Sequence, residues 1–496
     1  MNKTISIFLL FMGLCLFYAC SDGFDDYSSN TGDQLAFSTD TVVFDTIIST
    51  VNTPFQVFKI YNPNSKPLLI ESVYLENGEQ SGFKINVDGR AGASFKDVEI
   101  RANDSLFVFV DAKPAETGRN EPVLYSDHIV FVTNGVQQKV VLRASAQDAF
   151  IWKGRTITSN TALSNEKPYV IYDSLVVDEG VTLQIKEGTT FYMHNAADII
   201  VRGTLKIKGT LEKPVVIRGD RFDYLVDIPY DRVPGQWGGI RLEANSFNNE
   251  IDYAQIRNGM YGLDIKPSAL LHSKIILTNT VLTNFKGILI RAVNCMMDAE
   301  NCEFSNSKGA LLDLTGGMYF FVHCTMANYY FSSTEAGWGN SDNETIHLRS
   351  TYIVNEQTGE KIDYPIYQAN FGNNIIWGPK KTSDISIENK NVEKDGFWNV
   401  HYFVNCVIPN KDAKNDDPNS QDTIPTVVDC LIAVDPKFAN VDKDGTLFYD
   451  FRLDSISPAR DTASVAIARD FPYDMKGISR FRDDGPDMGA YEYVKP

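Results

Sequence analysis

The sequence contains few of the residues from which disulfides, metal sites or basic surfaces are built. Only seven of the 496 residues are cysteine, and none lies between residues 21 and 294. There is no Cys-x-x-Cys pair, and the six histidines are scattered singly without the spacing of metal ligands. We therefore expect no disulfide in the N-terminal third of the chain and no protein-bound metal site.

Positive charge is also scarce, since 46 Lys and Arg stand against 64 Asp and Glu, a net charge of −18. Nucleic acid and an anionic membrane surface both require a basic face on their partners, which argues against both. The hydrophobic fraction of 43% is ordinary for a globular protein. A chain of 496 residues is too long for one compact core, so we expect at least two domains.

The N-terminus carries an apolar run, residues 5–18, behind Lys3. A run of this length is typical of a signal peptide and is too short to span a bilayer. It ends in Ala19-Cys20, which resembles the lipobox of bacterial lipoproteins. The resemblance implies a signal peptide over residues 1–19 and a lipid attached to Cys20, while an ordinary signal peptide cut nearby is the alternative.

Residues 20–33 are polar and predict a flexible, lipidated tether. The acidic residues behind Cys20, among them Asp25 and Asp26, resemble the surface-export signal of lipoproteins in the Bacteroides group. This resemblance implies a chain anchored by lipid in a bacterial outer membrane and exposed on the cell surface.

Residues 34–147 contain seven short alternating apolar runs, separated by turn signals such as Asn62-Pro63-Asn64. Seven strands over about a hundred residues predict an immunoglobulin-like β-sandwich. The stretches 55–63, 105–114 and 129–134 resemble the cilium- and spindle-type immunoglobulin-like domains that serve bacteria as extracellular spacers.

A repeat organises most of the remaining chain. Asn284, Asn306 and Asn328 each close a β-type run and are separated by 22 residues and again by 22. A fixed period of this size indicates a solenoid, whose single coils cannot bury their apolar faces without stacking. Together with the runs 180–189 and 199–210, the repeat resembles right-handed parallel β-helices of the pectin-lyase-like superfamily. We expect that fold over residues 150–496.

The end of the chain, Asp487-Met488-Gly489-Ala490-Tyr491-Glu492, resembles the closing segment of bacterial surface β-helix proteins. An open solenoid end exposes apolar side chains and unpaired strand edges. We therefore expect this segment to close the β-helix.

Side-chain alternation predicts the direction of the recurring cysteines. Four of them precede an inward apolar residue by two positions and should form a buried stack of small hydrophobes: Cys302, Cys324, Cys406 and Cys430. A disulfide between neighbouring coils is the alternative in an exported protein.

The recurring asparagines predict a turn ladder made of Asn258, Asn284, Asn306 and Asn328. Asparagine tolerates the left-handed conformation needed at a sharp bend, and stacked amides also bond to one another. A role in glycan contact is the alternative for these amides.

Lys286 and Lys308 follow two of the repeats and should project from adjacent coils about 4.8 Å apart. They are candidates for binding an acidic sugar or for acting as a lyase base, and a solvated edge is the competing interpretation. The resemblance also implies hydrolase motifs, Asn-Thr-Asp, Asp-Asp, Gly-His-Gly and Arg-Ile-Lys, but none occurs in the repeating coils. The two Asp-Asp pairs of residues 150–496 lie in a predicted loop, at Asp416-Asp417, and in the C-terminal segment, at Asp483-Asp484. An inverting carboxyl pair among Asp252, Asp264, Asp298 and Asp313 remains open.

The sequence favours a surface lipoprotein whose β-helix binds glycan or another extracellular ligand, a polysaccharide or a surface protein, without catalysis. A polysaccharide lyase or glycoside hydrolase, and a structural or adhesive stalk, are the alternatives. No cofactor is expected, although Asp442-Lys443-Asp444-Gly445 is a fragment of a Ca2+-loop pattern. Function should reside in the insertions 331–345, 378–399 and 410–426.

Overall fold

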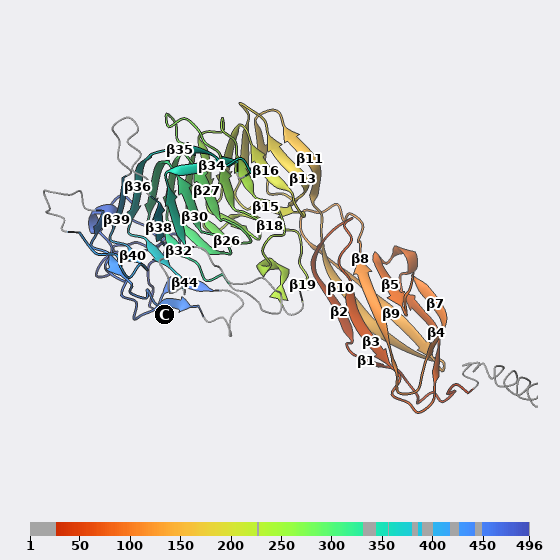
Figure 1. The fold of residues 1–496 in the computed structure, drawn as a ribbon. Coiled ribbons are helices and arrows are strands. Elements are labelled where there is room, and N and C mark those ends of the chain that lie inside the picture. Colours follow the sequence, from red (N-terminus) through yellow and green to blue (C-terminus); the bar gives the residue numbers. More distant parts are fainter. Residues whose placement is uncertain are drawn as a thin grey trace, which may run out of the picture. The chain divides into compact units, whose positions relative to one another are not determined.

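The computed structural model describes residues 26–225, 228–330, 344–355, 357–378, 385–388, 400–416, 426–441 and 449–495. The chain divides into two compact units, the first ending at Asp148 and the second beginning at Ala149 (Figure 1). Strands dominate both, and the one α-helix in these ranges is α2 (Val465–Ala468). None of the described helices is long and apolar enough to cross a membrane. The predicted all-β chain, a sandwich followed by a parallel β-helix, is confirmed.

The first unit is a sandwich of two five-stranded sheets, in which most neighbours are antiparallel and β10 pairs with β2 in parallel. One sheet has the order β1 (Ala36–Phe37), β3 (Gln56–Tyr61), β8 (Ser105–Ala112), β5 (Phe83–Val87) and β6 (Arg90–Gly92). The other has the order β2 (Thr41–Ile48), β10 (Val136–Gln147), β9 (Val123–Thr133), β4 (Leu68–Leu75) and β7 (Ser94–Ile100). Phe58 and Phe131, from different sheets, meet edge to face at 6.5 Å, so the sheets share one core.

The second unit is a parallel β-helix whose strands stack into three ladders, here called ladders 1, 2 and 3. Ladder 1 contains β15 (Thr190–Met193), β18 (Val215–Gly219), β23 (Ala254–Arg257), β26 (Val281–Phe285), β29 (Glu303–Ser307), β32 (Thr325–Ala327), β37 (Ile375–Trp377), β40 (Val407–Ile408) and β42 (Leu431–Ile432). Ladder 2 contains β16 (Asp198–Val201), β21 (Ile240–Leu242), β24 (Leu263–Ile265), β27 (Ile290–Val293), β30 (Leu312–Thr315), β33 (Ile346–Arg349) and β38 (Ile385–Glu388).

Ladder 3 contains β12 (Thr161–Leu163), β14 (Thr182–Lys186), β17 (Thr204–Lys208), β22 (Asn249–Asp252), β25 (Ile275–Thr278), β28 (Met296–Glu300), β31 (Gly317–Val322), β36 (Ile366–Gly372), β39 (His401–Val404) and β41 (Val427–Val428). At the N-terminal end, β11 (Phe150–Ile157) pairs with the long strand β13 (Tyr169–Val177). Because β13 pairs with β15 in its first part and with β16 in its second, it joins ladders 1 and 2.

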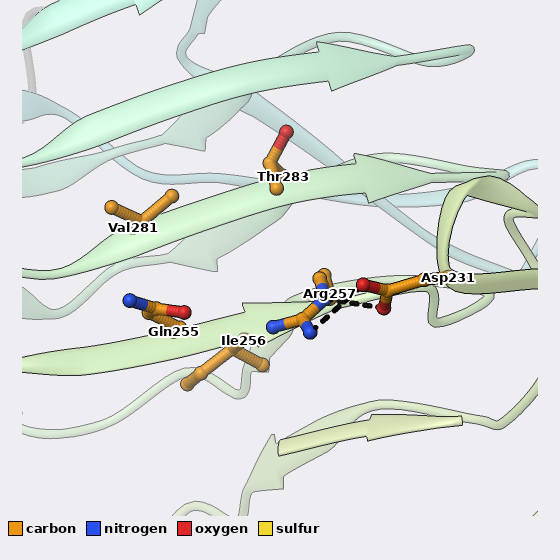
Figure 2. Close-up of a pocket in the computed structure, with 6 residues that line it drawn as sticks. All are labelled: Asp231, Gln255, Ile256, Arg257, Val281 and Thr283. Atoms are coloured by element: carbon orange, nitrogen blue, oxygen red, sulfur yellow. Dashed lines mark hydrogen bonds and ion pairs between the residues drawn. The ribbon is translucent and has the colours of Figure 1, made fainter. Parts of the chain in front are cut away.

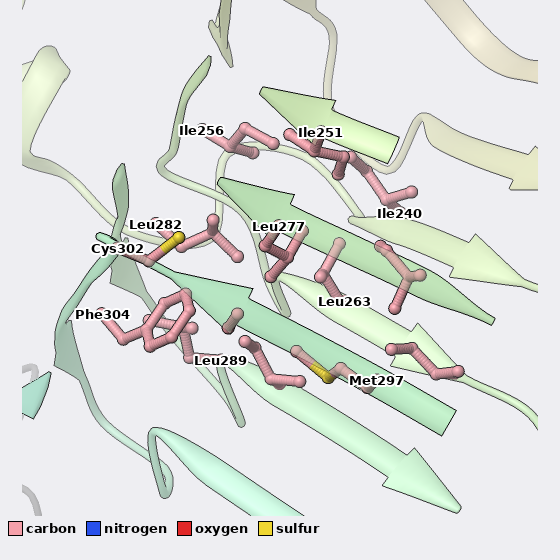
Figure 3. Packing of buried hydrophobic residues seen from close by; sticks show 14 of the residues in the cluster. Ile240, Ile251, Ile256, Leu263, Leu277, Leu282, Leu289, Met297, Cys302 and Phe304 are labelled. Atoms are coloured by element: carbon pink, nitrogen blue, oxygen red, sulfur yellow. The ribbon is translucent and has the colours of Figure 1, made fainter. Parts of the chain in front are cut away.

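The strand register explains the 22-residue repeat. Phe304 lies opposite Leu282 on the preceding coil and opposite Met326 on the following coil. One repeat is therefore one coil, and its inward residues continue a single core along the helix (Figure 3). On ladder 3 the rings of Phe321, Phe371 and Phe403 stack at 5.1 and 4.7 Å, nearly parallel. Truncating such a buried ring to alanine costs about 3–5 kcal/mol.

The four recurring cysteines are buried, as the side-chain alternation predicts, and they are free of disulfides: Cys302, Cys324, Cys406 and Cys430. Asn374 occupies the same position in the intervening coil. The amide N–H of Asn374 donates to Sγ of Cys406 at 3.4 Å, and that of Cys406 donates to Sγ of Cys430 at 3.4 Å. The sulfur atoms of Cys406 and Cys430 thus accept hydrogen bonds from backbone amides of the preceding coil, which is a structural role.

The C-terminal segment, residues 449–495, packs along the side of ladder 1. Its Met475, Ala490 and Tyr491 contact Val281 of β26, and its Leu453 and Met488 belong to one apolar cluster with Val407 of β40. Its β44 (Asp450–Leu453) pairs with β43 (Phe438–Asn440). The segment thus covers the side of ladder 1, and its closing of the solenoid end stays a prediction.

The segment is held by a buried ion pair. Nη1 of Arg480 lies 2.5 Å from Oε1 of Glu492, and both side chains are at most 1% exposed. Nη2 of Arg480 donates to Oδ1 of Asn301 at 2.9 Å, and the N–H of Gly489 donates to the carbonyl of Asn373 at 2.7 Å. The terminal Asp487–Glu492 motif therefore attaches to the turns between ladders 3 and 1.

Candidate functional site

The outer face of ladder 2 carries a row of charged side chains. In each coil the inward strand residues are apolar and the residue between them points outward. Arg241 pairs in register with Asp264, Asp264 with Arg291, Arg291 with Asp313 and Asp313 with His347. Since neighbouring strands lie about 4.8 Å apart, these five rungs extend over about 19 Å. We call these five residues the ladder 2 row.

Each carboxylate of the ladder 2 row is matched by cations. Asp264 lies 2.8 Å from Nζ of Lys266 and 3.7 Å from Nε of Arg241. Asp313, which is 6% exposed, lies 3.0 Å from Nη2 of Arg349 and 3.7 Å from Nε of Arg291. In these ion pairs the carboxylate oxygens are the acceptors and the Lys and Arg groups are the donors.

A hydroxyl and a carboxylate extend the ladder 2 row at its N-terminal end. The hydroxyl of Tyr261 donates to Oδ1 of Asp198 at 2.8 Å, and Nη2 of Arg241 lies 3.4 Å from Oδ2 of the same carboxylate. Burial, together with the neighbouring Asp198, raises the pKa of Tyr261 well above its usual range. The phenol therefore stays protonated and acts as a hydrogen-bond donor.

Arg291 is the most accessible member of the row, with a side chain that is 50% exposed. Its guanidinium carries five N–H donors, and its ion pair with Asp313 is long, at 3.7 Å. At the other end of the row, Nε2 of His347 lies 3.0 Å from Glu344. The row therefore offers an exposed donor at its centre and acceptors on either side of it.

One hairpin adjoins the row at a place where no insertion was predicted. The hairpin of β34 (Thr351–Asn355) and β35 (Glu360–Asp363) follows β33 directly. Residues 331–343 precede β33 in the chain and lie outside the described residues. Segments 379–384, 389–399 and 417–425 lie outside them as well.

A pocket of about 260 Å³ lies on the outer face of ladder 1. Gln255, Ile256 and Arg257 of β23 and Val281 and Thr283 of β26 line it. Asp231 closes one side from the 3-10 helix η2 (Tyr230–Arg232), which follows the short hairpin of β19 (Tyr224–Leu225) and β20 (Ile228–Pro229) (Figure 2).

The two predicted lysines lie at the turn between ladders 1 and 2, on adjacent coils, and neither belongs to the ladder 2 row. Lys286 is exposed and packs against Gly235, where a Cβ would lie 2.7 Å from its Cδ. Lys308 is half-buried. Lys286 therefore adjoins the loop that carries Asp231 rather than the charged row.

The predicted asparagine ladder has two kinds of member. Asn258, Asn284 and Asn306 adopt positive φ angles of 70°, 65° and 54°, but Asn328 is not among the residues with positive φ. Asn328 instead accepts the N–H of Ser307 on its Oδ1 at 3.0 Å. Oδ1 of Asn258, Nδ2 of Asn284 and Oδ1 of Asn306 are buried without a hydrogen-bond partner. These three atoms therefore form no amide-to-amide bond.

The four aspartates considered for an inverting pair divide between two faces. Asp264 and Asp313 lie on ladder 2, two rungs apart. Asp252 and Asp298 lie on ladder 3, where burial raises the pKa of Asp298. Cys20 and the Asp442–Gly445 fragment lie outside the described residues.

Sequence reasoning missed Arg241, Arg291 and His347, although a signal for them is present. Each lies between two apolar residues in a triplet that recurs once per coil: Ile240-Arg241-Leu242, Leu263-Asp264-Ile265, Ile290-Arg291-Ala292, Leu312-Asp313-Leu314 and Ile346-His347-Leu348. A charged residue flanked by inward positions must point outward.

Within the described ranges, one group of side chains is spaced to hold a metal ion together: Glu76, Asp127 and His128 of the first unit. Nζ of Lys139 lies 2.5 Å from Glu76, and Asp127 accepts the N–H of Asn77 at 3.2 Å. An ammonium in contact with one of the three ligands opposes a cation there, so this group fits a metal poorly.

Part of the β-helix is similar to a known protein family. A model described as a pectate-lyase-like β-helix domain matches residues 155–265, which include β16, β21 and β24 of ladder 2. The β-helix is of the pectate-lyase-like type. No curated protein matches the chain.

Solved structures resemble the chain at low similarity. The catalytic unit of a GH87 α-1,3-glucanase from Streptomyces thermodiastaticus has 9% identity and a TM-score of 0.24, covering 76% of this chain and 88% of that chain. A family 123 glycoside hydrolase from Clostridium perfringens has 9% identity and a TM-score of 0.17. The similarity covers 24% of this chain and 30% of that chain. A PapD-like domain of human CEP192 has 7% identity and a TM-score of 0.17, covering 23% of this chain and 87% of that chain. Similarity at this level carries no conclusion about the activity of the pectate-lyase-like β-helix.

Proposed function

We propose that the pectate-lyase-like β-helix binds an extracellular glycan along the ladder 2 row without cleaving it. The row repeats charged donors and acceptors at the strand spacing of about 4.8 Å, from Arg241 to His347. A linear polymer lying along the axis of the β-helix would meet a similar group at every second coil. The single observation that carries the proposal is this register-aligned row with the half-exposed Arg291 at its centre.

Binding without cleavage is favoured by the ion pairs of the row. Acid–base cleavage of a glycosidic bond needs one carboxyl that is protonated when the substrate arrives. Asp264 and Asp313 each form ion pairs with two cations and are the acceptors in these contacts. Both are therefore better suited to accept hydrogen bonds from sugar hydroxyls.

Hydrolysis is the second candidate, because the two aspartates stand two rungs apart. Two strand spacings amount to about 9.6 Å. This is close to the separation of about 6.5–9.5 Å between the two carboxyls of inverting hydrolases. A polysaccharide lyase and a non-binding stalk remain the further alternatives.

The proposed setting is the outer surface of a bacterial outer membrane, with the lipid carried by Cys20 and the first unit as an immunoglobulin-like spacer. The polar stretch 20–33 supports a tether of this kind. Metabolic labelling with a palmitate analogue tests it. We expect labelling of the wild-type chain and none of Cys20→Ala, while labelling of both would contradict lipidation at Cys20.

The binding proposal is tested by retention on immobilised polysaccharides, both neutral and acidic. We expect Arg291→Ala to weaken retention at least tenfold, since a hydrogen bond to a charged group contributes about 1.5–3 kcal/mol. Arg143→Ala removes an exposed arginine of the first unit and serves as the matched control. Equal retention of wild type and Arg291→Ala would contradict the proposed site.

A further inference from the structure

The pocket on ladder 1 has a charged end and an apolar end. Figure 2 shows Arg257 reaching from β23 toward Asp231, with Val281 and Thr283 on the neighbouring strand β26. Val281 packs against Met475, Ala490 and Tyr491 of the C-terminal segment. The pocket therefore lies between the loop that carries Asp231 and the C-terminal segment.

Positive charge exceeds negative charge around Asp231. Nε and Nη2 of Arg257 donate to the two carboxylate oxygens of Asp231 at 2.7 and 3.1 Å, and Nε of Arg218 lies 3.3 Å from the same group. Two guanidinium groups thus share one carboxylate. Burial alone would raise the pKa of Asp231, but the hydrogen bonds and charge of Arg257, with the charge of Arg218, lower it below its usual range.

Arg257 retains donors that Asp231 does not use. Its bonds to Asp231 involve Nε and Nη2, and no partner is found for Nη1 among the described residues. In Figure 2 one terminal nitrogen of Arg257 points away from Asp231, toward the side of Gln255. Two N–H groups of a guanidinium therefore face the pocket beside an exposed side-chain amide.

Thr283 adds a hydroxyl to the same wall. Its Oγ1 lies 2.8 Å from Oγ of Ser305, which is also 2.8 Å from Oε1 of Glu303. The Thr283 hydroxyl is thus fixed in position by the next coil. Thr283 lies in register with Arg257, so the two place a hydroxyl and a guanidinium at one end of the pocket, and Val281 and Gln255 lie in register toward the other end.

We propose that this pocket binds a small carboxylate that has an apolar body. The carboxylate would accept hydrogen bonds from Nη1 of Arg257, Gln255 and Thr283, where two arginines outnumber one aspartate. The apolar body would lie against Val281, within a space of about 260 Å³. The inference is independent of the glycan proposed for ladder 2, because it uses another face of the β-helix.

The experiment is a calorimetric titration of the full chain with acetate, propionate and butyrate at constant ionic strength, with chloride as the blank. We expect affinity to rise about fourfold for each added methylene, because burying one contributes about 0.8 kcal/mol. Sulfate measures how strongly the pocket attracts an anion that has no apolar body. Glucuronate measures how strongly it binds a carboxylate whose body is hydroxylated. Both should bind more weakly than butyrate.

Two variants test whether butyrate binds in this pocket. Thr283→Val keeps the shape and removes the hydroxyl, and Gln255→Ala removes an exposed amide. Each should weaken butyrate binding about fivefold, the equivalent of one hydrogen bond. Gln137→Ala, an exposed amide on the first unit, is the matched control.

Butyrate heat that equals the chloride blank, equal affinity across the three carboxylates, or sulfate bound as tightly as butyrate would overturn the inference. Unchanged butyrate binding in both pocket variants would also overturn it. Arg291→Ala separates the two proposals, because it should lose glycan retention and keep butyrate binding.

Discussion

Each coil contributes to the outer face of ladder 1 and to the outer face of ladder 2. The two faces differ in the side chains they carry and in the segments that contact them. On ladder 2 the outward residues alternate in charge and pair with one another, as Asp264 does with Arg241. On ladder 1 the outward residues become apolar toward the C-terminal end, where Ala327, Ile375 and Val407 lie under the C-terminal segment. The β-helix thus has one polar face, whose charged side chains pair with one another, and one partly apolar face, which the C-terminal segment covers.

The difference shows which positions of the repeat are constrained. Inward positions such as Leu282, Phe304 and Met326 must be apolar because every coil contributes to one continuous core. Outward positions are free to vary, so their character depends on neighbouring coils and on segments distant in the chain. Residues that bind a ligand are therefore sought at the outward positions of the ladders and not at the repeated inward positions.

The largest expected effect comes from removing the ion pair that holds the cover of ladder 1. Arg480→Ala leaves the buried carboxylate of Glu492 unpaired, and breaking a buried pair costs about 3–5 kcal/mol. Urea unfolding at pH 7 measures the loss. Arg452→Ala removes an arginine that is 62% exposed and pairs with Asp450, and it should cost less than about 1 kcal/mol. Similar losses in the two variants would argue against a specific attachment.

The next effect concerns the turn that separates the two faces. Asn306 has φ of 54°, and a leucine in this left-handed conformation is strained. Asn306→Leu should therefore lower the free energy of unfolding by about 1–3 kcal/mol, measured by thermal denaturation. Asn306→Gly adopts the same φ without strain and should lose much less. An unchanged melting temperature of the leucine variant would contradict the assignment.

The two faces should also differ in how stability depends on pH. Glu303 lies under the cover of ladder 1, where burial raises its pKa, although Tyr491 and Ser305 donate hydrogen bonds to it. A raised pKa means that the folded state holds the proton more tightly than the unfolded state. The contribution of Glu303 to stability is thus fully present below its unfolded pKa of about 4.5, and it is lost as pH rises through the folded value.

Urea unfolding of wild type and Glu303→Gln at pH 4.5, 6 and 7.5 tests this point. The difference in unfolding free energy, wild type minus variant, should fall steadily as pH rises. A constant difference, or one that grows with pH, would show that the carboxyl is ionised and paired in the folded state.

The smallest expected effect on stability lies on ladder 2. Arg291 is half exposed and its ion pair with Asp313 is 3.7 Å long, so Arg291→Ala should change the unfolding free energy by less than about 1 kcal/mol. Urea unfolding measures it beside the retention assay. A loss as large as that of Arg480→Ala would make the row structural rather than a binding face.

Much of the fold was predictable because burial determines it. The spacing of Asn284, Asn306 and Asn328 predicted one coil per repeat, and alternation placed Cys302 and Cys324 inside. The position of the C-terminal segment was not predictable from local pattern. It depends on contacts such as that between Arg480 and Asn301, which are 179 residues apart.

The candidate site was predictable only in part. Asp264 and Asp313 were considered among four aspartates, but the sequence alone did not separate them from Asp252 and Asp298 on ladder 3. The lysines were chosen because they recur, yet Lys286 lies beside the loop that carries Asp231. The pocket there also needed the fold, because η2 reaches β23 from a separate connection.

The most direct test of the account is one polysaccharide screen that reads both retention and the appearance of new reducing or unsaturated ends. The wild-type chain should retain at least one polysaccharide, Arg291→Ala should retain it at least tenfold less well, and neither should release new ends. New ends formed by the wild type, or equal retention by the variant, would contradict binding without cleavage on ladder 2.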